Sequence, residues 1–417
     1  MSVRKSSNFW WMLTGRSVSK LGDTFTFLAL SLMIFARTGS ALSVGQMMVA
    51  TYLPVLLLGP VAGVWVDRLN KRVLAIVCEV LRAGVVLAIP FVPDVAYIYG
   101  LAFLSATIGF FSKSAQGALV PTLFPKDDLR SYNAKIQTAV ETMGIAGPVL
   151  AGLVIGFWSY QAAFVVDSLT FVYSAVALVA LQMVKPDVTA QARMQTATAA
   201  EGASDETEPA PAEKKSFWAE LAGGARYMAG HARIRNVTVI MFTAMIVSGM
   251  FNVLLVVFSK DIIRVSDQQF GWLEAGIGVG LATGAWLMNY GKNIDLLTFV
   301  RVAAVIDGLL ISVLGLTGSF WAELATLVGI GIFSVIMMIA ATTLMQTEAE
   351  EEYMGRVLSF YQTVFMGGTV ASMMLAGWVE QYVSVPDIFV YGGLFTAAAT
   401  FLLGLRKLSK PAVEAKA

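Results

Sequence analysis

The stretch Leu53-Pro-Val-Leu-Leu-Leu-Gly-Pro-Val-Ala-Gly-Val-Trp-Val66 contains no charged residue, and the stretch from Ile330 to Leu344 shares this property. A helix needs about 20 such residues to cross ~30 Å of hydrocarbon. Of the 417 residues, 57% are hydrophobic and 14% are charged, whereas a soluble protein carries roughly one quarter charged residues. The sequence therefore predicts an all-α protein that crosses a membrane many times.

Charge and composition exclude several classes of protein. The 29 Lys and Arg residues balance 28 Asp and Glu residues, which excludes a nucleic-acid binder that works by general basicity. The single cysteine, Cys78, allows no internal disulfide and no cysteine-rich metal site. The single histidine, His231, lies in a polar stretch, which excludes a histidine-ligated metal site or a Ser-His-Asp triad within the membrane. No nucleotide-binding P-loop is present, and we expect neither an enzyme nor a cofactor.

Polar and turn-forming breaks divide the chain into twelve predicted spans. Helices are favoured over a barrel because the apolar runs do not alternate with period two. The first run follows Arg4 and Lys5, as in a signal peptide, but it continues with internal charges to Phe35, so we expect a retained span. The predicted spans are 9–36, 42–66, 73–93, 96–124, 134–158, 161–184, 236–259, 268–290, 296–316, 320–345, 357–381 and 386–405.

The basic residues predict the orientation of these spans. With the N-terminus inside, 21 of the 29 Lys and Arg residues fall in inner segments, whereas Arg37, Lys260 and Arg264 fall outside. Such asymmetry predicts that both termini lie in the cytoplasm and that the protein resides in the cell's inner (cytoplasmic) membrane.

A hydrophilic interruption separates two sets of six spans. Its residues 187–215 are rich in Ala, Thr, Glu and Pro and predict a flexible linker. Its residues 216–235 predict an amphipathic helix whose arginines suit the anionic inner leaflet. We expect this helix to join the two halves, with regulation as the other interpretation. The predicted domains are an N-terminal bundle 1–184, a linker 185–235, a C-terminal bundle 236–405 and a cytoplasmic tail 406–417.

The two sets of spans repeat each other in sequence. A shift of 221 residues superposes matching residues from two separated regions, including a Trp and a Tyr. The protein is therefore predicted to consist of two pseudo-symmetric six-helix bundles, an arrangement typical of alternating access around a central cavity. The matching pairs are Gly63 and Gly284, Trp65 and Trp286, Lys71 and Lys292, Tyr132 and Tyr353, Lys135 and Arg356, Gly147 and Gly368, and Gly156 and Gly377.

Twelve spans in two repeated halves, joined by a long inner loop, resemble the major facilitator superfamily. The segment Gly63-Val-Trp-Val-Asp67-Arg68-Leu-Asn-Lys71-Arg72 is similar to that superfamily's signature between helices 2 and 3. The resemblance implies the major facilitator fold, and a latch of the outward-facing state formed by Gly63, Asp67, Arg68, Lys71 and Arg72. Physically, these charges can cap a neighbouring helix or pair across the two halves. The corresponding loop 284–293 lacks Asp-Arg, so we expect a one-sided latch.

The fifth span contains a Gly-Pro element that is similar to one found in antiporters of the superfamily. It consists of Gly144, Gly147, Pro148 and Gly152. Gly144, Pro148 and Gly152 recur every four residues, so they share one helix face that permits a kink and close helix approach. Simple helix packing explains the same spacing equally well.

Three further segments, 111–121, 164–171 and 355–357, resemble exporters of the macrolide-efflux and enterobactin-exporter type. The resemblance covers nearly the whole chain outside the linker. The chain departs from this group at Ser114, where proline is usual, and at Lys113, where lysine is not. The resemblance implies export of a drug, a siderophore or a similar molecule by proton antiport.

A charge in the middle of the bilayer costs at least ~2.5–3.5 kcal/mol and should therefore face a cavity or a partner. In the first span Arg16, Lys20 and Asp23 share one face, which Phe27 continues. Asp23 lies about halfway along the span. It is predicted either to bind the coupling proton or to form a permanent ion pair with Lys20 that holds the helix in place.

Charged residues in the third to fifth spans add further candidates. Glu79 and Arg82 are three residues apart, and we expect them to pair. Glu141 lies about 12 Å inside its span without a basic neighbour one turn away, so it is the second candidate for proton coupling. Lys113 is expected either to neutralise Glu141 or to bind an anionic substrate.

Spans outside this region hold the remaining charged candidates. Asp307 is the third candidate for proton coupling, and Arg301 lies about 240° around the same helix, so we do not expect them to pair. Glu274 and Asp167 lie about 10 Å below the outer surface, where we expect solvation, and we expect Asp167 to serve packing.

The central cavity is predicted to be largely apolar. Met and Phe are abundant, with 20 and 25 residues, and such flexible and aromatic surfaces accept varied amphipathic ligands. The candidates for the cavity wall are Phe27, Met245, Phe251 and Asn252, with helix packing or lipid contact as the other explanation for each.

We therefore expect a monomeric secondary transporter, surrounded by membrane lipids, that exports an amphipathic small molecule in exchange for protons and binds no nucleic acid. A facilitator, an importer or a lysolipid flippase on the same fold remains an alternative. So does a membrane sensor that has lost transport. Direction of movement and dependence on the proton gradient would separate these alternatives.

Overall fold

A computed structural model of the chain describes residues 3–124, 129–182, 217–290 and 294–405, and within these ranges it contains helices and no strand. The described helices follow all twelve predicted spans, so the predicted all-α fold is confirmed. Short segments η1 (Ile89–Phe91), η3 (Phe258–Ile262) and η4 (Met288–Tyr290) extend three of them. The helices are α1 (Val3–Thr38), α2 (Ala41–Arg68), α3 (Lys71–Ala88), α4 (Val95–Leu123), α5 (Leu129–Phe157), α6 (Tyr160–Ala180), α8 (Phe217–Gly230), α9 (Ala232–Val257), α10 (Asp267–Leu287), α11 (Leu296–Leu316), α12 (Phe320–Glu348), α13 (Glu351–Val379) and α14 (Val385–Leu405).

Ten of the described helices are long and apolar enough to cross a membrane. Helices α10 and α13 are not among these ten, because glycines and polar residues interrupt their apolar runs. Helix α8 lies inside the range predicted for the amphipathic helix. The predicted linker 187–215 and tail 406–417 lie outside the described residues.

Capping residues explain where several helices begin. The side chains of Asn70, Asp94, Ser159 and Ser319 each accept a hydrogen bond from a backbone amide in the first turn of the helix that follows. Ser266 forms a full capping box at the start of α10. Such caps satisfy amides that have no partner within the helix, so these short polar breaks separate one apolar helix from the next.

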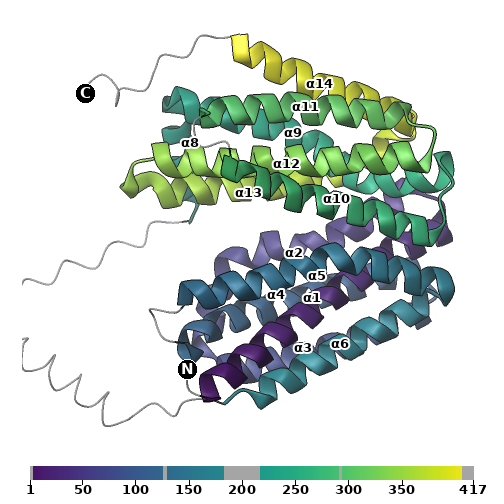
Figure 1. Cartoon of the computed structure of the whole chain (residues 1–417), viewed down its shortest axis with the longest axis vertical. Coiled ribbons are helices and arrows are strands. Elements are labelled where there is room, and N and C mark those ends of the chain that lie inside the picture. Colours follow the sequence, from purple (N-terminus) through teal and green to yellow (C-terminus); the bar gives the residue numbers. More distant parts are fainter. Residues whose placement is uncertain (1–2, 125–128, 183–216, 291–293, 406–417) are drawn as a thin grey trace, which may run out of the picture.

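The helices form two groups, shown one above the other in Figure 1. In the N-half, α1 to α6 pack on one another, and in the C-half α8 to α14 do the same. We call the end of the molecule where α1 begins and α14 ends the proximal end, and the opposite end the distal end. The main contacts between the halves join α5 to α10 and α2 to α13.

Glycines allow the two halves to touch near the distal end. A Cβ atom added to Gly152 of α5 would lie 2.9 Å from Cα of Gly271 in α10. On the other side of the molecule, a Cβ added to Gly45 of α2 would lie 2.6 Å from the carbonyl oxygen of Met373 in α13. Tyr160 also donates a hydrogen bond to Asp267 across the halves, at 3.2 Å. The halves are therefore in backbone contact at the distal end.

The proximal part of α5 is polar and exposed, unlike its distal part, which packs against α10. Its residues Gln137, Thr138, Glu141 and Thr142 are polar and exposed. On α5, the close approaches between described glycines and the other half involve only residues further along the helix, from Ile145 onward. The molecule is therefore closed distally, and the polar face of α5 is accessible toward the proximal end.

Arg72, one of the residues of the predicted latch, binds within the N-half. Its guanidinium donates to the carbonyl oxygens of Leu178, at 3.0 Å, and Val179, at 2.5 Å, in the last turn of α6. A cation at a helix C-terminus satisfies free carbonyls and the helix dipole. Arg68 is exposed, and the surroundings of Gly63 and the side chain of Asp67 are not among the described parts of the structure.

A second proximal cluster joins three helices of the C-half. Arg233 of α9 pairs with Asp295 before α11, at 2.5 Å, and with Glu348 at the end of α12, at 2.6 Å. Partial burial acts to raise the pKa of Asp295, but the hydrogen bond and charge of Arg233 outweigh it and hold this pKa below its usual range. Asp295 therefore stays charged at neutral pH and keeps these helix ends together.

We predict that Gly271→Val separates the halves at the distal end. The new side chain would meet the carbonyl oxygen of Pro148, 2.5 Å from a Cβ at this position, and overpacking of this kind costs about 1–3 kcal/mol. In a Cys78→Ser background, maleimide should label a Gln268→Cys reporter faster when Gly271→Val is present. Gly276→Val is the control, because its side chain would meet Leu324 of the same half. Equal labelling rates in the two variants would contradict the prediction.

Candidate functional site

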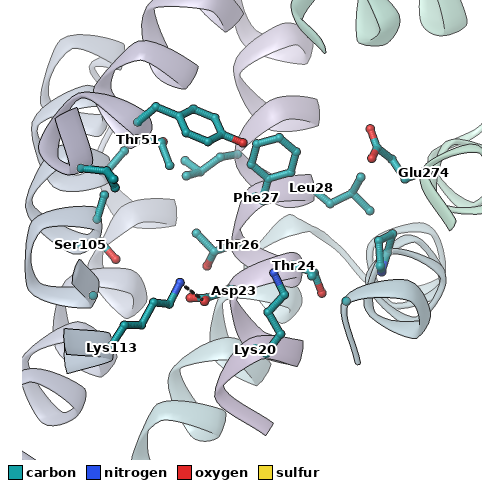
Figure 2. Close-up of a pocket in the computed structure, with 18 of the residues that line it drawn as sticks. Lys20, Asp23, Thr24, Thr26, Phe27, Leu28, Thr51, Ser105, Lys113 and Glu274 are labelled. Carbon is teal, nitrogen blue, oxygen red and sulfur yellow. Dashed lines mark ion pairs between the residues drawn. The ribbon is translucent and has the colours of Figure 1, made fainter. Parts of the chain in front are cut away.

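A cavity of about 470 Å³ lies between the halves. Helices α1 to α5 provide most of its wall, and α10 of the C-half provides the rest. Among the charged residues of its wall, Figure 2 shows Lys20, Asp23 and Lys113 lying together and Glu274 lying apart from them. The predicted aromatic candidate Phe27 lines this cavity.

Asp23 is the centre of the charged cluster. One of its oxygens lies 2.5 Å from the guanidinium of Arg82 in α3, and the other lies 2.9 Å from the ammonium of Lys113 in α4. The predicted Lys20–Asp23 pair is therefore wrong, since cations from two other helices take that place. One interpretation of the sequence pairs Lys113 with Glu141. The structure pairs Lys113 with Asp23 instead. The pair with Lys113 is the more accessible one, because 64% of the Lys113 side chain is exposed.

Contacts with α4 and α6 hold the side chain of Arg82 in position. Its Cζ lies 4.0 Å from the ring centre of Phe171 in α6, a cation–π contact. On its other side α4 carries Gly109, where a Cβ would come within 2.9 Å of Cζ of Arg82. The guanidinium thus lies in a slot between α4 and α6 and points toward α1.

Glu79, one turn before Arg82, is buried with 1% of its surface exposed. We expected Glu79 and Arg82 to pair, but the ion pair of Arg82 goes to Asp23. Glu79 instead accepts hydrogen bonds from Ser112 at 2.6 Å and Gln116 at 3.0 Å, both from α4. Its carboxyl group is thus satisfied by neutral donors directly behind the cavity wall.

Asp167 is fully buried, so the expectation that it is solvated is wrong. It accepts hydrogen bonds from Thr26 of α1 and from Thr170, one turn further along α6. Its side chain occupies the space beside Gly22 of α1 that a larger residue would fill. Depth along a helix did not predict burial here, because α1 packs tightly over this face of α6.

Glu141 is exposed and accepts a hydrogen bond from Gln137 at 2.6 Å. This corrects the expectation of a carboxyl group deep in the bilayer, since this face of α5 looks toward the accessible proximal side. A Cβ at Gly144 would lie 3.3 Å from Cε of Lys20 and 3.9 Å from an oxygen of Glu141. The Gly-Pro element thus brings these two side chains close to each other without an ion pair.

The rest of the Gly-Pro element serves close packing. Gly147 leaves room for the side chain of Thr24 on α1. Pro148 lines the cavity, and Gly152 forms the distal crossing with α10. Arg16 lies on the same face of α1 as Lys20 but is not part of the cavity wall.

In the C-half, Glu274 reaches the cavity, although we expected it to be solvated near the distal surface. Asp307 of α11 is buried and accepts a hydrogen bond from Ser334 of α12 at 2.7 Å, away from the cavity wall. As predicted from their angular separation, Asp307 and Arg301 do not pair. Two buried nitrogens of Arg301 have no hydrogen-bond partner within the described structure.

Three predicted cavity residues pack elsewhere. Met245 fills the space at Gly368 of α13, with its sulfur 2.6 Å from the position of a Cβ there. Phe251 packs against Phe389, with ring centres 5.9 Å apart. Asn252 donates to the carbonyl oxygen of Ser248 at 2.7 Å. None of the three lines the cavity, because these side chains of α9 are engaged within the C-half.

The sequence analysis did not identify several polar residues of the site, namely Ser112, Gln116, Thr26 and Thr170. Their spacing held a usable signal for one pair. Ser112 and Gln116 are four residues apart in α4, so they share one helix face. Nothing local marked Thr26, because its importance comes from its contact with another helix.

We predict that Arg82→Gln strongly destabilises the protein. It removes the cation that pairs with Asp23 and leaves this carboxylate with Lys113 alone, and breaking a buried pair costs about 3–5 kcal/mol. Adding Asp23→Asn to Arg82→Gln should recover part of this loss, because the unpaired charge is then gone. Thermal unfolding of the purified protein measures both effects, with Arg226→Gln, at an exposed position of α8, as control. An Arg82→Gln melting curve like that of the control would refute this account of the site.

Comparison with known proteins shows relatives along nearly the whole chain. The protein described as "Uncharacterized MFS-type transporter YfiS" from Bacillus subtilis is 22% identical over 401 residues, which cover 94% of this chain and 91% of that protein. "Macrolide efflux protein A" from Streptococcus pyogenes is 22% identical over 403 residues, with 92% of each chain covered.

A solved structure has the same fold. A bacterial homologue of the human lysosomal transporter Spinster matches with a TM-score of 0.68 and 11% identity, covering 97% of this chain and 96% of that one. A sequence model of the Major Facilitator Superfamily matches residues 12–373. With the helical fold and the cavity between two halves, these matches lead to one conclusion: the chain belongs to the Major Facilitator Superfamily, and it is a multi-pass membrane transport protein rather than an enzyme.

Proposed function

We propose that the protein exports an amphipathic small molecule from the cytoplasm in exchange for protons, in the cytoplasmic membrane. The observation that carries this proposal is the cavity between the halves, in whose wall a carboxylate, Asp23, is held by two cations. The name of one relative, macrolide efflux protein A, supports this direction of transport.

The proximal end is the cytoplasmic end in this proposal. The excess of Lys and Arg in the segments at that end supports this orientation. The state described here would then face inward, with its cavity reachable from the cytoplasm and its distal crossing closed. We propose that the N-half and the C-half rock about the cavity as two units, with the boundaries predicted from the sequence. The residues of the predicted latch would act in the opposite state.

Asp23 is our first choice for the proton-coupling residue. In the present state two ion pairs stabilise its carboxylate, which suits a transporter that has released its proton to the cytoplasm. Protonation from the other side would remove the attraction to both Arg82 and Lys113. Lys113 reaches Asp23 from the accessible side, so its pair would separate more readily than that of the buried Arg82. Loss of that pair would loosen α4 from α1 and favour the change of state.

Glu141 and Asp307 are weaker candidates. Glu141 lies at the proximal approach to the cavity, close to Lys20, and we propose that it relays protons between Asp23 and the cytoplasm. Asp307 has Ser334 as its hydrogen-bond partner and lies outside the cavity wall. A proton bound there would have to act through the packing of α11 on α12, so we rank Asp307 last.

Transport into everted membrane vesicles tests the proposal. With a panel of a macrolide, a catecholate siderophore and a lysolipid, at least one compound should accumulate in vesicles that carry an acidic interior. Accumulation should stop when nigericin collapses the pH gradient. Asp23→Asn should abolish accumulation driven by the gradient, because its side chain cannot take up and release a proton, while Glu141→Gln should slow it.

The control is Asp261→Asn, which removes one carboxylate from the exposed distal surface of the C-half and should transport normally. Uptake that only equilibrates the compound across the membrane, with or without a pH gradient, would indicate a facilitator, and movement in the other direction an importer. Full gradient-driven transport by the Asp23→Asn, Glu141→Gln double variant would overturn the assignment of both coupling residues.

A further inference from the structure

Two charged side chains in the cavity wall form no ion pair with any residue that the structure describes. Lys20 of α1 and Glu274 of α10 both line the cavity. Among the described residues, neither forms an ion pair or a side-chain hydrogen bond, whereas Arg82 and Lys113 both pair with Asp23. Figure 2 shows Lys20 beside Asp23 and Thr24, and Glu274 next to Leu28, away from the other labelled charged side chains.

The unpaired charges lie on opposite halves of the protein. Lys20 belongs to the N-half and Glu274 to the C-half. Apolar side chains occupy the wall near them, including Phe27 and Leu28 from α1 and Ile277 from α10. An unpaired charge beside apolar surface is costly, so each of these two groups favours a ligand that brings the opposite charge.

A ligand with a single charge would leave one of the two groups unsatisfied. A cation would pair with Glu274 but would be repelled by the positive charge of Lys20. An anion would pair with Lys20 but would be repelled by the negative charge of Glu274. A ligand that carries both charges on an apolar body would satisfy both groups and also cover the apolar wall. The cavity would thus discriminate against ligands with a single charge, because they leave either Lys20 or Glu274 without a partner.

We propose that the substrate is a zwitterionic amphiphile whose anionic group binds Lys20 and whose cationic group binds Glu274, with its apolar body against Phe27 and Leu28. This inference rests on the proposed transport function, because it names the kind of molecule that the cavity carries. It also gives the C-half a part in substrate binding. A substrate that bridges α1 and α10 would contact both halves at once, as coupling of binding to rocking requires.

Two dyes that differ in one charge test the proposal. Rhodamine 110 has a cationic ring system and a free carboxylate, and rhodamine 123 is its methyl ester, which keeps only the cation. Binding to the detergent-purified protein is measured by equilibrium dialysis at neutral pH, without a membrane or a gradient. The wild-type protein should bind rhodamine 110 more tightly than rhodamine 123.

Each variant should then change binding of the two dyes differently. Lys20→Gln should weaken binding of rhodamine 110 by at least about tenfold, as expected for loss of one partner of a desolvated charge pair, and should not weaken binding of rhodamine 123. Glu274→Gln should weaken binding of both dyes by a similar factor, because both keep the cation. Glu274→Asp should retain part of the binding.

Matched controls remove the same charges outside the cavity. Asp261→Asn removes a carboxylate from the distal surface of the C-half, and Lys135→Gln removes an exposed lysine from α5 of the N-half. Both should bind the dyes as the wild-type protein does. Gel filtration and thermal unfolding show whether each cavity variant is folded, and the retained binding of rhodamine 123 by Lys20→Gln is a second check.

Three results would overturn the proposal. Rhodamine 123 binding the wild-type protein as tightly as rhodamine 110 would indicate a simple cation site, and tighter binding of the dianion fluorescein would indicate an anion site. Failure of all three dyes to bind would reject this cavity as a site for charged amphiphiles. Because binding needs no gradient, normal binding in a protein that fails to export would count against the proposed function alone.

Discussion

The cost of placing charge inside a membrane is the constraint on which the N-half depends. Arg82 lies within a predicted span, so its guanidinium needs a partner of opposite charge there. That partner is Asp23 on α1, at 2.5 Å. The neighbouring helices are shaped around this pair. Gly109 leaves space for the guanidinium, and Phe171 provides an aromatic face for it. A polar interaction thus sets how α1, α3, α4 and α6 pack, and apolar contacts fill in around it.

A different principle governs the contact between the halves. The crossing of α5 on α10 has backbone atoms on both sides, since Gly152 and Gly271 face each other. Such a contact has few side chains to reorganise, so two helices can part and meet again without a rotamer change. The side-chain link nearby is one hydrogen bond from Tyr160 to Asp267. The N-half therefore has ion pairs between its own helices, while its distal crossing with the C-half brings two backbone surfaces together.

The fold could be predicted closely from the sequence, whereas the site could be predicted only in part. Uninterrupted apolar runs and short polar breaks predict the helices, because each helix in lipid satisfies its own backbone. The residues of the charged cluster were also recognised, since Asp23, Arg82 and Lys113 stand out in apolar surroundings. Their pairing was not predictable, because sequence spacing reports neighbours on one helix, and Asp23 takes both partners from other helices.

The same limit explains why Glu141 was expected to be buried and Asp167 to be solvated. Depth along a helix can be counted from the sequence. Which face of the helix looks toward a neighbouring helix depends on the packing of the whole bundle, and that packing reverses both expectations.

The two copies of the internal repeat differ in where they carry charged residues. At the offset of 221 residues, the C-half has Ala244, Val300 and Ala303 where the N-half has Asp23, Glu79 and Arg82, and all three are buried. The ionic cluster thus lies in one of the two sequence copies, while Glu274 lies in the other. After a gene duplication, such a division would let each copy change without altering the charged residues of the other. Recombination between paralogues at the junction of the two copies would then be a short evolutionary route to a new specificity.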